Sequence, residues 1–147
     1  MHGTRPSGNR KGEDVERNEA VEFVKENMRA VLATRRSNGD PQLSPITISV
    51  DGEARVVFST TEDRTKTKNL RRDPRASLSV LKEAFFGGSI QIDGRAEIVS
   101  LPEAMELLVD YYRSIRGEHP DWDDYRAAME REQRCLVRIE IERAVRT

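Results

Sequence analysis

Two short turns, Asn38-Gly39 and Asp51-Gly52, restrict the fold of this chain more than any other feature. Asn-Gly and Asp-Gly between runs of alternating apolar residues are strong signals of a β-hairpin. The turns separate three runs that read as strands: residues 28–35, 42–50 and 54–60. Because consecutive hairpins join strands of opposite direction, these runs predict an antiparallel sheet.

The rest of the chain adds three strands and several helices. Alternating apolar residues predict strands at residues 76–82, 89–100 and 134–141. Helical spacing predicts helices from Val15 to Asn27, from Ser100 to Gly117, and from near Asp121 onward. Ser100 and Glu103 have the spacing of a capping box at a helix start. Residues 61–75 are expected to form a short polar turn or helix.

This order of elements predicts a mainly β fold with peripheral helices, in which six antiparallel strands close into a small barrel. Gly94 lies inside a predicted strand, where glycine indicates a bulge or a tight bend. Pro45 lacks a backbone N–H, so the strand that contains it is expected at an edge or at a bulge.

The 147 residues are expected to form one domain over residues 15–147, preceded by a flexible tail over residues 1–14. Charged residues make up 35% of the chain, yet its net charge is only −1. No apolar run is long enough to span a bilayer. One cysteine and two histidines make a metal site unexpected, and the lone Cys135 fits a reducing cytoplasm. Cys135 alternates with core residues, so we expect it to be buried and inert.

Residues 64–75 carry six cations and one anion, a local net charge of +5. They follow the hydroxyl-rich end of a strand, Ser59-Thr60-Thr61. Hydroxyl groups, a helix N-terminus, and Arg and Lys side chains together suit a phosphate group. A solvated basic turn explains the same charges about equally well. A nucleic-acid surface is disfavoured, because the segment has no interleaved aromatic residues.

Three blocks resemble the split β-barrel flavin and deazaflavin oxidoreductases, relatives of pyridoxamine 5′-phosphate oxidase. The blocks are residues 39–44 (GDPQLS), residues 64–77 (RTKTKNLRRDPRAS), and residues 112–126 with the run GEHPDWDDYR. The resemblance covers about residues 15–145 and is strongest to the actinobacterial branch that uses coenzyme F420. It implies a homodimer with the cofactor at the subunit interface. We expect a small-molecule substrate, and the composition predicts neither a nucleic-acid nor a membrane partner.

The resemblance also implies cofactor-binding residues. Arg64 and Lys66 would hold the cofactor phosphate, with Ser59, Thr60, Thr67 and Asn69 around them. Gln42, Pro45 and Thr47 would border the ring system through side chain or backbone. The position that is aromatic beside the ring in related proteins is Gly87 here, so Phe86 is the candidate for that contact.

Six cations in twelve residues suit the long anionic tail of F420 better than the single phosphate of FMN. The expected function is hydride transfer from reduced F420 to a small conjugated or aromatic molecule. An FMN-dependent oxidoreductase and a non-catalytic binder of cofactors or polyanions remain alternatives. The cofactor carries the chemistry in such enzymes, and no catalytic side chain is assigned. We read His119, at a helix boundary, as a structural or surface residue and not as a catalytic one.

Overall fold

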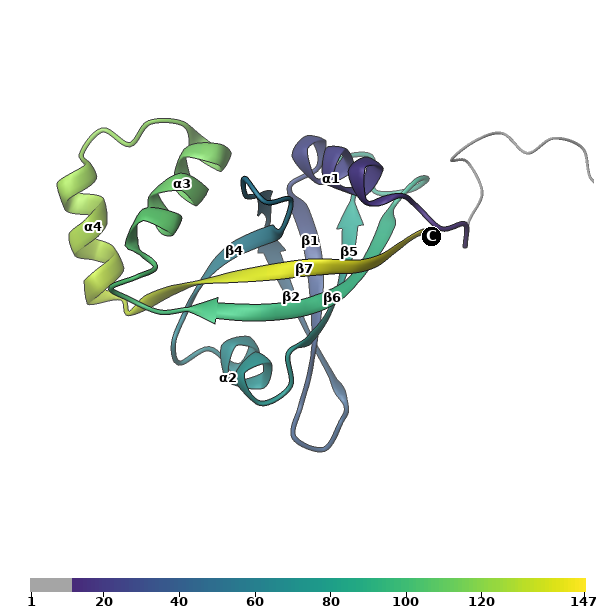
Figure 1. Cartoon of the computed structure of the whole chain (residues 1–147), viewed down its shortest axis with the longest axis horizontal. Coiled ribbons are helices and arrows are strands. Elements are labelled where there is room, and N and C mark those ends of the chain that lie inside the picture. The colour runs from purple at the N-terminus through teal and green to yellow at the C-terminus, as the bar shows by residue number, and fades with distance from the viewer. Residues whose placement is uncertain (1–11) are drawn as a thin grey trace, which may run out of the picture.

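In the computed structural model of this chain, which describes residues 12–147, seven strands form one antiparallel sheet with four helices around it (Figure 1). The strands are β1 (Arg29–Arg35), β2 (Pro41–Thr47), β3 (Ser49–Val50), β4 (Val56–Thr61), β5 (Arg75–Leu81), β6 (Ile90–Val99) and β7 (Arg134–Arg146). The helices are α1 (Arg17–Glu26), α2 (Thr65–Arg72), α3 (Met105–Arg116) and α4 (Trp122–Arg131).

The sheet curls into a half-barrel whose two edges are neighbours in the sequence. The strand order is β2-β1-β5-β6-β7-β4-β3, so β2 and β3 are the outermost strands. Only Ile48 separates them along the chain. Its side chain is fully buried, and its N–H donates to the Met28 carbonyl at 2.8 Å. The chain therefore crosses from one edge of the sheet to the other at this residue.

The prediction of six strands was wrong because the chain turns inward at Ile48. Residues 42–50 were expected to form one strand, whereas the structure has β2 paired with β1 and β3 paired with β4. Residues 42–50 therefore contribute a strand to each of the two sheet edges. The additional strand, β3, arises because the chain passes from one edge to the other as the half-barrel curls. The edge position expected from Pro45 is confirmed, since β2 is an outermost strand.

The bend expected at Gly94 is confirmed in the long ladder between β6 and β7. The register of this ladder shifts between Asp93 and Gly94. A Cβ atom at Gly94 would lie 2.1 Å from the Glu140 carbonyl oxygen and 2.8 Å from Cγ2 of Ile139. The two backbones approach so closely here that only glycine fits.

The sheet separates two clusters of buried side chains. Inward-facing residues fill the half-barrel, with Leu32, Ile48, Phe58, Leu78, Ile92 and Val137 among them. Outward-facing Val57 and Leu136 instead pack under α3 and α4 against Leu108, Tyr125 and Met129. Because successive side chains of β4 and β7 point to opposite faces of the sheet, the same two strands contribute residues to both clusters. Within residues 12–147 no helix is both long and apolar enough to cross a membrane.

Of the helix ends predicted from the sequence at Ser100, Gly117 and Asp121, the structure confirms the last two. Gly117, at a φ of 79°, ends α3, and the Asp121 carboxylate accepts a hydrogen bond from the Asp124 N–H at 3.1 Å to begin α4. The capping box at Ser100 was wrong. The Ser100 hydroxyl donates to Glu62 at 2.7 Å instead, and α3 begins at Met105.

The expected tail over residues 1–14 lies only partly within the described residues. Asp14 forms an isolated antiparallel bridge with Val145, so the last part of the expected tail lies against β7. Residues 1–11 of that tail lie outside the described part of the chain.

Candidate functional site

The six cations of residues 64–75 divide into two groups. Arg71, Arg72 and Arg75 bond to other parts of the protein. Arg71 pairs with Glu62. Arg72 donates to the Arg35 carbonyl at 2.7 Å. Arg75 pairs with Asp73 at 2.7 Å, and this hydrogen bond lowers the pKa of the Asp73 carboxyl to about 2. The C-terminal half of the basic segment therefore serves the protein's own structure and needs no ligand to explain its charges.

The other three cations, Arg64, Lys66 and Lys68, have no salt-bridge partner among residues 12–147. Lys66 is half-buried in the first turn of α2. Burial lowers the pKa of its ammonium group, and the positive charges of Arg64 and Arg134 lower this pKa further. A partly desolvated ammonium beside two guanidinium groups is electrostatically unfavourable until an anion neutralises it. This cluster of Arg64, Lys66 and Arg134, the cation cluster, is the strongest candidate anion site.

Hydroxyl groups seat α2 against the end of β4. The Thr67 hydroxyl donates to the Thr61 carbonyl at 2.8 Å, and the Thr60 and Thr67 hydroxyl oxygens lie 3.2 Å apart. Since Thr67 has only one hydroxyl proton, Thr60 is the donor of the second bond. Both threonines are buried, so these bonds fix the direction in which the first turn of α2 presents its cations.

A second buried polar chain joins α2 to β1 and β2. The Asn69 amide donates to the Thr34 hydroxyl at 3.1 Å, and the Thr34 oxygen lies 3.5 Å from the Gln42 side-chain oxygen. Arg72 donates to the Asn69 side-chain oxygen at 2.9 Å. Thr34 is fully buried and Asn69 is 5% exposed. Asn69 and Gln42 therefore belong to one network, and Asn69 positions α2.

Thr47 and Ser59 lie on the two sides of the open barrel edge, and Tyr111 joins them. The Tyr111 hydroxyl donates to the Thr47 carbonyl at 2.7 Å. Burial raises the pKa of this hydroxyl, while a hydrogen bond with the Ser59 backbone acts in the opposite direction. The positive charge of Arg134 acts on the same hydroxyl. Thr47, Ser59 and Tyr111 therefore adjoin the cation cluster.

The structure does not bring all the expected ring contacts together. Strand alternation places Gln42 inward, toward Thr34, whereas Pro45 and Thr47 are exposed on the outer face of β2. Phe86 is 81% exposed in the loop between β5 and β6, which lies at the opposite end of β5 from α2 (Figure 1). Within one chain, Phe86 is not part of the group formed by Arg64, Lys66, Thr67 and Asn69.

Three residues in this region were not in the expected site. Thr34 continues the inward phase of Ala30 and Leu32, so a hydroxyl among core positions was the available signal. Tyr111 lies within the helix predicted between Ser100 and Gly117, and nothing in its local sequence indicates its bond to the Thr47 carbonyl. Arg134 faces Thr61 across the β4–β7 ladder. No local pattern marks it, because 66 residues separate it from Lys68 along the chain.

The arrangement is suited to binding and orienting an anion, and among residues 12–147 it contains no activated nucleophile. Cys135 is fully buried, and burial raises the pKa of its thiol to about 12, as its expected inertness requires. The His119 Nδ1 accepts a hydrogen bond from the Asp121 N–H at 2.9 Å. The ring lies among Tyr112, Trp122 and Tyr125, with centroid distances of 5.0 to 5.6 Å. These contacts agree with a structural role for His119.

Comparison with known proteins places these features in a family. The sequence model of pyridoxamine 5′-phosphate oxidase matches residues 16–146, almost the whole described chain. The chain belongs to this family. The family includes oxidoreductases, and its fold binds flavin-type cofactors.

Solved structures share the fold. The conserved hypothetical protein Rv2991 from Mycobacterium tuberculosis is 26% identical, with a TM-score of 0.74 over 92% of this chain and 86% of that chain. An F420 reductase is 21% identical, with a TM-score of 0.65 over 84% and 93%. The heme storage protein HutZ from Vibrio cholerae is 17% identical, with a TM-score of 0.64 over 88% and 93%. One fold thus serves proteins with different ligands.

Proposed function

We propose that this protein is a cytoplasmic, homodimeric oxidoreductase that uses coenzyme F420 and transfers a hydride to a small conjugated or aromatic molecule. The observation that carries this proposal is the cation cluster, in which half-buried Lys66 lacks a carboxylate partner among residues 12–147. Likeness of fold to an F420 reductase supports the choice of cofactor.

The residues of the cation cluster fit the phosphate of such a cofactor. Arg64 offers a planar fork of donors and Lys66 a point charge, and both favour a phosphate oxygen over a neutral group. The N–H groups in the first turn of α2 add a weaker attraction for negative charge. Lys68 remains for the additional carboxylates of the F420 tail, which FMN lacks, and Arg134 would join it only by exchanging its partner Glu132. Three cations without a salt-bridge partner among residues 12–147, namely Arg64, Lys66 and Lys68, favour the longer polyanion.

The ring of the bound deazaflavin would supply the hydride chemistry. The protein's own part is to orient that ring and to shield it from water. Pro45 and Thr47 form the exposed outer face of edge strand β2, and the Tyr111 hydroxyl fixes the Thr47 carbonyl beside Ser59. We infer that this edge borders the ring while the cation cluster holds the tail.

A flat outer face on β2, β1 and β5 supports the proposed homodimer. Leu43, which is 64% exposed, pairs with Ala33, and Ala33 pairs with Ser77 on the next strand. Short side chains beside an exposed leucine suit close packing of two sheets. In this arrangement Phe86 would reach the ring from the partner, which accounts for its distance from α2 within one chain.

A fluorescence titration of the purified protein with F420, FMN and FAD tests the cofactor. We expect F420 to bind with micromolar or better affinity and more tightly than either flavin. The variant Arg64→Ala/Lys66→Ala should lose at least about 100-fold in affinity, because two charge-assisted contacts disappear. The matched variant Lys25→Ala/Arg143→Ala removes two exposed cations, from α1 and from β7, that lie away from α2, and it should bind normally. Oxidation of reduced F420 in the presence of an acceptor then tests catalysis.

The same titration separates the alternatives. Tighter binding of FMN than of F420 would identify a flavin-dependent enzyme of the same fold. A protein that binds no cofactor, yet loses salt-dependent affinity for nucleic acid in the double variant, would be a polyanion binder. Sedimentation of the wild type and of Leu43→Glu tests the dimer, because a charge at this exposed position opposes packing of the two outer faces.

A further inference from the structure

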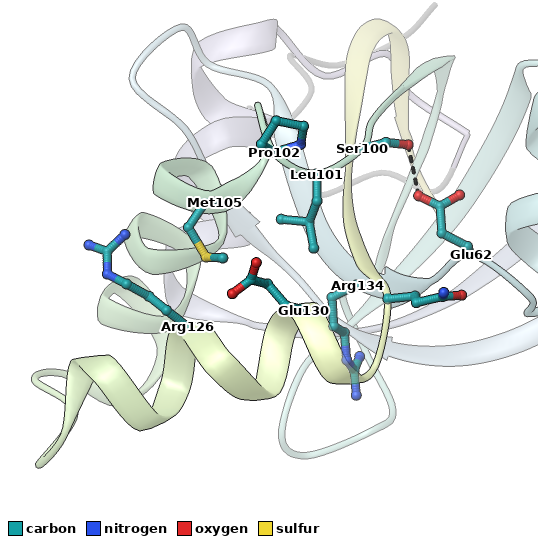
Figure 2. A pocket seen from close by; sticks show the side chains of 9 residues that line it. Glu62, Ser100, Leu101, Pro102, Met105, Arg126, Glu130 and Arg134 are labelled. Carbon is teal, nitrogen blue, oxygen red and sulfur yellow. Dashed lines mark hydrogen bonds between the residues drawn. The ribbon is translucent and has the colours of Figure 1, made fainter.

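A cavity of about 740 Å³ lies between α3, α4 and the connection from β4 to α2 (Figure 2). Its size is within the range of small-molecule sites. Leu101, Pro102 and Met105 form an apolar wall. None of these residues belongs to the cation cluster, although Arg134 borders both regions.

The charged groups around this cavity differ in whether they already have partners. The Glu62 carboxylate accepts the Ser100 hydroxyl at 2.7 Å and pairs with Arg71. Arg126 pairs with Glu106, and Arg134 pairs with Glu132 at 3.0 Å. Both guanidinium groups point away from the centre of the cavity in Figure 2. Three of the four charged side chains in the lining are therefore neutralised by the protein itself.

Glu130 is the exception. Its carboxylate points toward Leu101 and Met105 in Figure 2, and it has no salt-bridge or hydrogen-bond partner among residues 12–147. A carboxylate that faces an apolar wall gains most from a cation that carries its own apolar surface. The requirement is for one positive charge, because Glu62 already has its partners.

We propose that this cavity binds a small organic amine, with Glu130 as the counter-ion of its ammonium group and Leu101, Pro102 and Met105 in contact with its apolar body. The one charge of this cavity that is unpaired within residues 12–147 is opposite in sign to the cation cluster, with which the cavity shares Arg134. The amine site goes beyond the proposed function and is independent of it, so protein without any cofactor is sufficient for its test.

Dansylcadaverine, a flat fluorophore with a primary ammonium group, is a suitable probe, and its N-acetyl derivative is the neutral counterpart. In a fluorescence titration of the wild-type protein at low salt we expect the ammonium form to bind about fivefold more tightly. This preference should shrink as salt is added, because the carboxylate is partly exposed. Equal affinity of the two probes, or no binding of either at millimolar concentration, overturns the proposal.

Variants locate the site. Glu130→Gln keeps the shape of an exposed helical side chain and should make the affinities of the two probes equal. Glu103→Gln removes a carboxylate outside the cavity lining and should retain the fivefold preference. Leu101→Ala should weaken both probes about equally, because it shortens the apolar wall. A preference that persists in Glu130→Gln, or one that is lost in Glu103→Gln, places the charge recognition elsewhere and sinks the assignment.

Discussion

The two sides of the half-barrel are held together by different means. On the side of β6 and β7, ten residue pairs form a backbone ladder that is interrupted only by the bulge at Gly94. On the side of β2 and β3, the edges approach without a continuous ladder, and the Tyr111 hydroxyl joins the Thr47 carbonyl to the backbone of β4. We call these the closed side and the open side.

The difference shows how one sheet can combine stability with binding. On the closed side, β6 and β7 each pair with a neighbouring strand on both edges. On the open side a side chain replaces the ladder, so one edge of β2 has no partner strand among residues 12–147 and Ser59 and Thr61 of β4 remain partly exposed. Ser59, Thr47 and the cation cluster lie there. Ligand contacts are therefore expected where the sheet is least paired.

The substitution Gly94→Ala should break the closed side and have the largest effect. The new Cβ would lie 2.1 Å from the Glu140 carbonyl oxygen, so the two strands would have to separate. We expect a loss of at least about 4 kcal/mol in the free energy of unfolding, measured by urea denaturation. The matched Gly52→Ala variant has nothing within 4 Å of its Cβ and should change stability by less than about 0.5 kcal/mol.

The substitution Thr34→Val tests the buried polar network under α2 while keeping the shape of the side chain. It removes the hydroxyl that accepts the Asn69 amide at 3.1 Å and leaves that amide unpaired. Stability should fall by about 2 kcal/mol. The control Thr65→Val makes the same chemical change at an exposed position of α2. If both variants unfold at the same urea concentration, Asn69 does not depend on Thr34.

The substitution Tyr111→Phe weakens the open side of the half-barrel and leaves the closed side unchanged. It removes the hydroxyl that bonds to the Thr47 carbonyl and should reduce the free energy of unfolding by about 1 kcal/mol. It should also increase amide exchange at the junction of β2 and β3 more than in β6 and β7. Tyr112→Phe is the matched control, because its hydroxyl has no hydrogen bond within residues 12–147. Uniform exchange throughout the sheet would contradict the distinction between the two sides.

The smallest effect concerns Lys66. Burial and the neighbouring cations keep its pKa below the ordinary lysine value of 10.5, so the folded protein releases this proton before the unfolded chain does. Between the two pKa values the unfolded chain binds more protons, and the free energy of unfolding rises with pH. Urea denaturation at about pH 8 and about pH 10 measures this rise. It should be smaller in Lys66→Met, and inorganic phosphate should stabilise the wild type more than this variant.

Much of the fold could be predicted because its signals are local. The hairpin turns and Gly94 act through the conformations of a few adjacent residues. The errors arose where a distant partner decided the outcome. Ile48 bends because the barrel interior receives its side chain, and the Ser100 hydroxyl bonds to Glu62, 38 residues away, in preference to a cap.

The same distinction applies to the candidate site. A contiguous run of sequence revealed the cations of α2, but not that Arg72 and Arg75 are held by the Arg35 carbonyl and by Asp73. The neighbours of Arg134 and Glu130 are determined only when β7 and α4 pack against the rest of the molecule. Charge density is visible in a sequence, whereas the partners of each charge are visible only in three dimensions.

The reactivity of the buried Cys135 thiol measures how often this structure opens. The residue lies in β7 opposite Thr60, on the same face of the sheet as the hydroxyl that bonds to Thr67 of α2. An alkylating reagent can reach the sulfur only after β4 and β7 separate, and burial holds the pKa of the thiol near 12 until then. The rate of alkylation in native buffer therefore reports how often the strands beneath the proposed phosphate site come apart, without any introduced label.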